Sequence, residues 1–138
     1  MRTHHVFLFL FIGLTSYAQQ AASELIVRVE NVSEHKGQLM VGLFNKKEHF
    51  LKEVFLGDQR PVGQSVMTMC FTGLEPGAYA VSLYHDKNEN GKLDANFLGI
   101  PNEPYAFSNN AKGWLGPPTF EECLIEINQD KKEIIISL

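Results

Sequence analysis

Strict alternation of apolar and polar residues constrains the fold of this chain more than any other feature of its sequence. Leu25, Val27 and Val29 share one face of a strand, while Arg28 and Glu30 lie on the other face. The same period of two runs through residues 39–43, 65–71, 79–83, 123–127 and 134–138. Several short alternating segments with turn residues between them predict an all-β fold, built as a sandwich or a barrel.

One segment between the predicted strands has a different period. Residues 46–56 read KKEHFLKEVFL, and Phe50, Val54 and Phe55 recur there at helical spacing. We expect a short helix or an irregular crossover at this point. The chain has 138 residues, which allow one domain and leave no room for a second.

The sharpest turn signal is Pro76-Gly77, within the sequence LEPGAYAV of residues 74–81. Proline presets the first central position of a type II turn, and we expect Gly77 to supply the positive φ of the second. The pattern L-x-P-G-x-Y-x-V resembles a strand junction of transthyretin-like and carboxypeptidase-regulatory-like sandwiches. We therefore predict an all-β fold, an immunoglobulin-like or transthyretin-like antiparallel β-sandwich of about seven strands with one long ordered loop.

The first residues have the three parts of a secretory signal peptide. Arg2 precedes an apolar run over residues 6–14, and Ser16 and Ala18 are small residues at the −3 and −1 positions of a cleavage site. The run spans only about 14 Å as a helix, less than half of a bilayer core. We expect cleavage after Ala18 (residues 1–18), a single β-sandwich domain over residues 19–138, no transmembrane segment, and a location in the periplasm or at the cell surface.

Charge and cysteine content exclude several classes of function. Twelve basic against sixteen acidic residues give a net charge of −4, which argues against a nucleic-acid partner because such proteins need a basic face. Two cysteines are too few for a disulfide scaffold or a four-thiolate zinc site. Cys123 shares the apolar face of its predicted strand, whereas Cys70 lies opposite Met67 and Met69, so the sequence leaves open whether the two thiols pair.

Residues 86–119 show no strand pattern, and they form a longer loop than compact domains usually contain. Disordered segments are poor in large apolar residues, but this segment has many of them, so we expect an ordered loop. The aromatic residues Tyr105, Phe107 and Trp114 would form the loop's own core. Alternatively, they would stack on a sugar or a peptide.

The start of this loop has the spacing of a calcium-binding loop. Calcium takes six to eight oxygen ligands, and alternate residues of a tight loop can direct theirs to one centre. The sequence HDKNENGKLD places suitable residues at positions 1, 3, 5, 6 and 9, and position 7 would contribute its backbone carbonyl. These residues are Asp86, Asn88, Asn90, Gly91 and Asp94, with Lys92 at position 7. Position 12 is Phe97 where the motif needs an acid, so Glu103 or another acid would replace it, or the segment is only an Asn-Gly turn.

The segment 74–120 resembles a bacterial family catalogued as domain of unknown function 2141. Members pair an export signal with L-x-P-G-x-Y-A-V, then H-D-x-N-x-N-G-x-L-D-x-N-F-L-G-x-P-x-E, F-S-N-N and G-P-P-x-F. Every one of these motifs is present here in that order. The resemblance implies a location in the periplasm or at the cell surface, and it implies no activity, because the family is named for having none assigned.

Two classes of function remain open after this reading. The first is a non-enzymatic binding or structural module with a weak calcium site and no other cofactor, and with a cell-envelope protein or a glycan as partner. The second is a hydrolase acting on glycan or peptide through two carboxylates of the 86–119 loop, which would have to lie about 5–10 Å apart across a cleft. The available acids are Asp86, Asp94, Glu103, Glu121 and Glu122. His85 has few partners in view, and we expect it to be structural.

Overall fold

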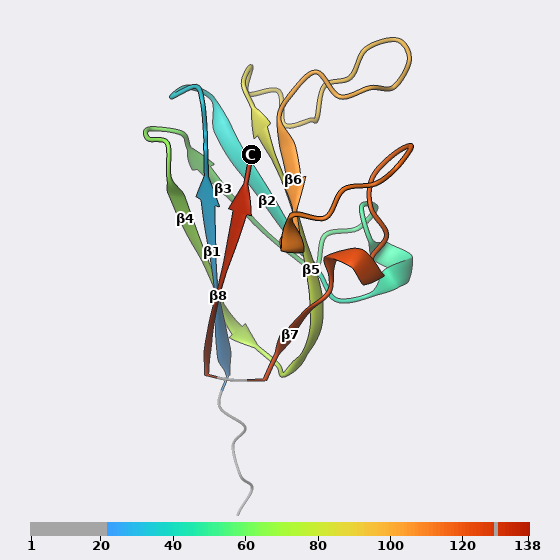
Figure 1. Ribbon diagram of the computed structural model, residues 1–138. Coiled ribbons are helices and arrows are strands. Elements are labelled where there is room, and N and C mark those ends of the chain that lie inside the picture. The colour runs from blue at the N-terminus through green and yellow to red at the C-terminus, as the bar shows by residue number, and fades with distance from the viewer. Residues whose placement is uncertain (1–21, 129) are drawn as a thin grey trace, which may run out of the picture.

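The computed structural model describes residues 22–128 and 130–138 (Figure 1). The predicted signal peptide and the cleavage site after Ala18 lie outside these residues.

Two β-sheets pack face to face in the described part of the chain. The three-stranded sheet has the order β4-β1-β8, and the five-stranded sheet has the order β3-β2-β5-β6, with β7 pairing separately with β5. The strands are β1 (Ser23–Glu30), β2 (Gln38–Phe44), β3 (Leu56–Pro61), β4 (Met67–Leu74), β5 (Gly77–Asp86), β6 (Tyr105–Phe107), β7 (Ile125–Ile127) and β8 (Lys131–Ser137). The predicted all-β sandwich is confirmed, but its strand pairs are not all antiparallel, since β1 and β8 run parallel.

The alternating apolar residues form the core between the two sheets. Leu25, Val27 and Val29 of β1 are fully buried, as are Leu39 and Leu43 of β2 on the opposite sheet. The buried core also contains Val41, Met67, Met69, Phe71, Tyr79, Val81, Leu83, Ile125, Ile127 and Ile136. Each strand that supplies these residues directs every second side chain into the core, so the apolar residues that alternate in the sequence are the ones that are buried.

Two strands have no counterpart in the sequence prediction. β3 is an edge strand with six exposed or half-buried residues, and Asp58 and Arg60 form an ion pair along it. Charged residues on an edge strand discourage pairing with other molecules, and they also remove the apolar alternation that marks a strand. β6 has three residues, so it falls within the segment expected to lack strands.

A second, smaller cluster covers the outer face of the five-stranded sheet. The predicted crossover is a 3-10 helix, η1 (Lys47–His49), and it brings Phe50 against Phe44 and Phe120 at ring distances of 5.3 and 5.6 Å. Cys123 lies in this cluster and belongs to the 3-10 helix η3 (Glu121–Cys123), so the expected strand over residues 123–127 begins two residues later, at Ile125.

The prediction for Pro76-Gly77 is wrong in its backbone geometry. Gly77 does not have a positive φ; it begins β5 and pairs with Ile127. The positive φ of this hairpin falls on Gly73, at 75°. Strand pairing holds Gly77 in an extended conformation, so a side chain there would be compatible with its backbone.

The two cysteines are free thiols on opposite sides of the sandwich. Cys70 is exposed on β4 and pairs across the ladder with Ile26, on the outer face of the three-stranded sheet. Cys123 is buried in the cluster on the other sheet's outer face. The full thickness of the core therefore separates them.

Candidate functional site

The calcium-type turn over residues 86–94 begins where β5 ends. Asp86 is 1% exposed. Its Oδ1 accepts the main-chain N–H of Asn90 at 3.1 Å, and its Oδ2 accepts that of Gly91 at 2.7 Å. One carboxylate thus folds the next five residues around itself, and Glu89 and Gly91 take positive φ to allow this.

The other sequence-predicted ligands are brought together in this turn. The Oδ1 atoms of Asn88 and Asn90 accept the main-chain N–H groups of Asn90 and Lys92, at 3.2 and 2.9 Å. The side-chain amides of the two asparagines then donate to the Asp94 carboxylate, at 2.6 and 3.0 Å. Asp86, Asn88, Asn90 and Asp94 therefore form one hydrogen-bonded cluster of oxygen-bearing side chains.

Glu103, the acid considered for the twelfth ligand position, binds the main chain at both ends of the turn. It is 7% exposed, and its Oε1 accepts the N–H of Lys87 at 2.8 Å while its Oε2 accepts the N–H of Asp94 at 3.0 Å. The Glu103 carboxylate thereby joins the start of the turn, at Lys87, to its end, at Asp94. Phe97, at position 12 of the spacing, is 95% exposed. Among the described residues, no group of three or more His, Cys, Asp or Glu side chains is placed to hold a metal ion.

The chain next forms an apolar tip over residues 95–101, closed by a bridge between Ala95 and Pro101. Asn96 organises it, since its Oδ1 accepts the N–H groups of Leu98 and Ile100 at 2.9 and 3.1 Å. Phe97, Leu98 and Ile100 are nevertheless 95%, 68% and 57% exposed. The backbone is therefore fixed by polar contacts while the apolar side chains face solvent.

A second apolar tip spans residues 111–118. Trp114 and Leu115 are each 94% exposed there, and Tyr105 on β6 is 44% exposed. Of the aromatic residues expected to form the loop's own core, only Phe107 is buried. That expectation is wrong for Trp114, whose side chain faces solvent. Tyr105 packs edge-on against Phe107 at a ring distance of 5.9 Å but stays partly exposed.

A pocket of about 410 Å³ lies between the two tips on the outer face of the five-stranded sheet. Leu93, Gly99 and Pro101 line it from the first side, and Gly116 and Pro117 line it from the other. Its floor is apolar, with Phe44, Leu83, Tyr84, Tyr105 and Phe107. The hydroxyl of Tyr84 donates to the carbonyl of Gly91 at 3.0 Å, which joins this floor to the calcium-type turn.

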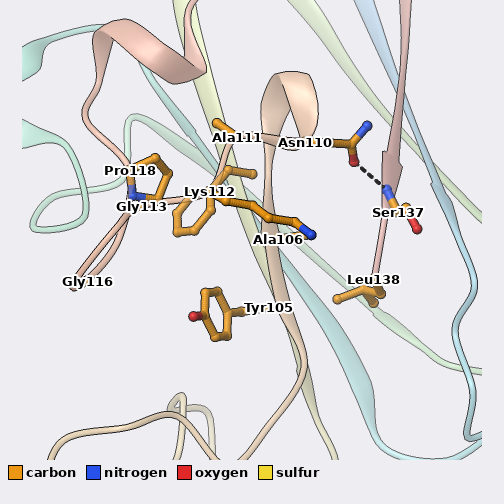
Figure 2. A pocket seen from close by; sticks show the side chains of 11 residues that line it. Tyr105, Ala106, Asn110, Ala111, Lys112, Gly113, Gly116, Pro118, Ser137 and Leu138 are labelled. Carbon is orange, nitrogen blue, oxygen red and sulfur yellow. Dashed lines mark hydrogen bonds between the residues drawn. The ribbon is translucent and has the colours of Figure 1, made fainter.

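A second cavity, of about 440 Å³, lies between β6, residues 110–118 and the end of β8, and is called the edge cavity below. Figure 2 shows it between β6, the 111–118 tip and the end of β8, with the Lys112 side chain extending across it toward Ser137. Asn110 accepts the N–H of Ser137 at 2.8 Å, and so fixes the wall formed by β8 (Figure 2).

The motif F-S-N-N, residues 107–110, latches the loop to three parts of the sandwich. Ser108 is fully buried; its Oγ accepts the N–H of Val81 at 2.9 Å and donates to the carbonyl of Cys123. Asn109, at a φ of 61°, donates to the carbonyls of Glu122 and Leu124 at 3.1 and 2.8 Å. The motif is structural, as its hydrogen bonds all go to backbone groups.

The family described as "Uncharacterized protein conserved in bacteria (DUF2141)" matches residues 27–135. The chain belongs to this family. No curated protein and no solved structure matches this chain. Within the described residues of this DUF2141 chain, no helix is long and apolar enough to cross a membrane.

Charged residues of the DUF2141 domain surround the base of the turn. Lys87 and Lys36 both bind Glu34, and these hydrogen bonds, that of Lys87 first, lower the pKa of the Glu34 carboxyl to about 2. Burial, together with the charges of Asp86 and Glu103, raises the pKa of the Tyr84 phenol. His85 is fully buried, and its Nε2 donates to the carbonyl of Lys36 at 2.7 Å. Its Nδ1 is buried without a hydrogen-bond partner among the described residues, so the ring is only half satisfied.

The five acids considered for hydrolysis lie in structural contacts of the DUF2141 fold. Asp86 and Glu103 direct both oxygens at backbone N–H groups. Glu121 pairs with Lys47 at 2.6 Å, which lowers its pKa, and Glu122 accepts the N–H and the hydroxyl of Thr119. Asp94 binds the two asparagine amides.

Proposed function

We propose that this DUF2141 protein is an exported, non-enzymatic binding module that presents the 86–119 loop to a cell-envelope protein or glycan. The signal-peptide pattern of residues 1–18 supports export to the periplasm or cell surface. The observation that carries the binding role is the pair of apolar tips. Five large apolar side chains are more than half exposed beside an apolar pocket, and the backbone of the 95–101 tip is fixed by the hydrogen bonds of Asn96. Exposed apolar clusters of this kind mark interaction sites.

The tips are tested with matched surface variants. Purified cell-wall glycan and a solubilised envelope-protein fraction serve as two separate probes for cosedimentation or retention on the immobilised domain. We expect one probe to bind the wild type and to lose binding in the double variant Phe97→Ser/Trp114→Ser. Ile135→Ser is the control, because Ile135 is 53% exposed on the opposite sheet. Equal binding by the tip variant and the control, or no binding of either probe, would refute the role of the tips.

We further propose that residues 86–94 bind calcium weakly and thereby stabilise the loop that carries the tips. Asp86, Asn88, Asn90 and Asp94 supply side-chain oxygens, and Lys92 supplies its carbonyl. The incomplete motif favours a dissociation constant in the range of about 10⁻⁴–10⁻³ M that extracellular modules show. The hydrogen-bonded cluster of these side chains supports the proposal, because calcium would replace the amide donors that now satisfy the Asp94 carboxylate.

The calcium proposal is tested by thermal unfolding with and without 1 mM calcium. With a dissociation constant of about 100 μM, the ligand stabilises the fold by about 1.4 kcal/mol, which raises Tm by about 3–6 °C. Asp94→Asn should abolish the increment, and Asp130→Asn, in the turn before β8, should keep it. Asp86→Ala is a poor test, since it also removes two backbone hydrogen bonds. An unchanged Tm of the wild type would reduce the motif to a polar turn.

The alternative of a carboxylate-based hydrolase needs two acids that face an open cleft. The oxygens of Asp86 and Glu103 face backbone amides instead. Turnover of a glycan or peptide that disappeared in Asp94→Asn would replace the binding role with this one.

A further inference from the structure

The hydrogen-bonding phase of β6 leaves part of its backbone facing away from the sheet. His85 donates its N–H to the carbonyl of Pro104 at 2.8 Å, and the same register pairs Leu83 with Ala106 and Tyr84 with Tyr105. Bonded and non-bonded pairs alternate along an antiparallel ladder. Ala106 is therefore a bonded position like Pro104, and the N–H and C=O of Tyr105 point away from β5. The N–H of Phe107 points the same way.

This free edge borders the edge cavity. β6 ends the five-stranded sheet, and the cavity beside it is lined by Tyr105 and by small residues of the 111–118 tip, including Ala111 and Gly113. The wall opposite is closed, because Asn110 accepts the N–H of Ser137 and donates to the carbonyl of Ile135. None of the loop and side-chain hydrogen bonds of the described residues reaches the main-chain groups of Tyr105.

We propose that the edge cavity binds an extended peptide, which adds a strand to β6 through the main chain of Tyr105. This inference rests on the proposed binding function and gives its ligand a chemical class. A peptide in extended conformation carries N–H and C=O groups at the spacing that Tyr105 requires. Lys112 lies across the cavity and is in none of the ion pairs of the described residues, so its charge complements an acidic side chain of the peptide (Figure 2).

Amide hydrogen exchange of the peptide-free protein tests the geometry first. The Ala106 amide is bonded to β5 and should exchange slowly, whereas the Tyr105 amide should exchange at least about tenfold faster. Equal protection of the two amides would overturn the inference, because the edge would then be closed.

Selection from a displayed library of short random peptides tests the ligand. We expect acidic peptides to be selected on the wild-type domain. N-methylation of alternate peptide residues in one register should weaken binding about tenfold or more, and methylation in the other register should leave it nearly unchanged. Lys112→Glu should weaken binding by a similar factor. Lys46→Glu, at an exposed position just before η1, should not.

The outcomes separate this inference from the proposed function. Failure to select any peptide, or peptides insensitive to N-methylation, overturns strand addition at β6. If the wall glycan still binds through Phe97 and Trp114 in that case, the binding module stands and its ligand is not a peptide strand.

Discussion

Gly37 lies directly against the main chain of Asp86. A Cβ placed on Gly37 would be 2.3 Å from the Asp86 carbonyl oxygen and 2.8 Å from the Cα of Lys87. The turn before β2 therefore supports the first residues of the calcium-type turn, and Gln38 pairs with Asp86 beside it. The contact forbids any side chain at position 37, and it has a measurable consequence.

Gly37→Ala should destabilise the fold by at least about 1–3 kcal/mol, because Gly37 also has a φ of +70°. Denaturant midpoints of the variant and the wild type measure the effect. Gly63→Ala is the control, since a Cβ there meets nothing within 4 Å. Similar midpoints for the two variants would contradict the close approach of the turn to Asp86.

Glu103→Gln should loosen the 86–103 segment without unfolding the sandwich. The variant's amide group can accept only one of the N–H groups of Lys87 and Asp94, and a buried donor without a partner costs about 1–3 kcal/mol. Faster hydrogen exchange of one or both amides is the expected sign, with little change at core amides such as that of Val27. Glu89→Gln, on the exposed side of the same turn, should leave all of these rates as they were.

The two thiols should differ strongly in reactivity toward an alkylating reagent. Cys123 is fully buried, and burial raises the pKa of its thiol to about 11, so it should react only in denaturant. Cys70 is exposed and should react in the native protein, slowly, since partial burial and Glu24 raise its pKa too. Mass spectrometry then shows one modification in the native wild type and none in native Cys70→Ser. A denatured, unreduced protein without reactive thiols would instead indicate a disulfide.

Stability should decline in acid partly through Glu34. The pKa of its carboxyl falls from 4.5 to about 2 in the folded protein, since Lys87 and Lys36 bind the charged form. A lowered pKa stabilises the fold above the unfolded value of 4.5, and the contribution is lost as the pH falls toward 2. Glu34→Gln should therefore flatten the stability curve between these values, by a small amount because the group is at the surface. Denaturant midpoints from pH 2 to pH 6 measure it, and a curve as steep as that of the wild type would exclude this role.

Local sequence determined the sandwich, because an alternating strand carries its burial pattern in its own residues. Leu25, Val27 and Val29 are buried as their spacing indicates, and the parity that separates Cys70 from Met67 and Met69 holds in the structure. The sequence also predicted the 86–94 turn, since the hydrogen bonds among its own residues join positions close in sequence.

Only the tertiary structure showed which distant residues contact the turn and whether the side chains of the tips are exposed. Glu103 ties Lys87 to Asp94 across many residues, and the three residues of β6 are a strand only because β5 lies beside them. The exposure of Trp114 could not be predicted from the sequence, because the residue type alone does not tell whether a large apolar side chain is buried or faces solvent. Burial and long-range hydrogen bonding depend on neighbours that no local pattern specifies, so the open edge at Tyr105 appears only when the sheets are assembled.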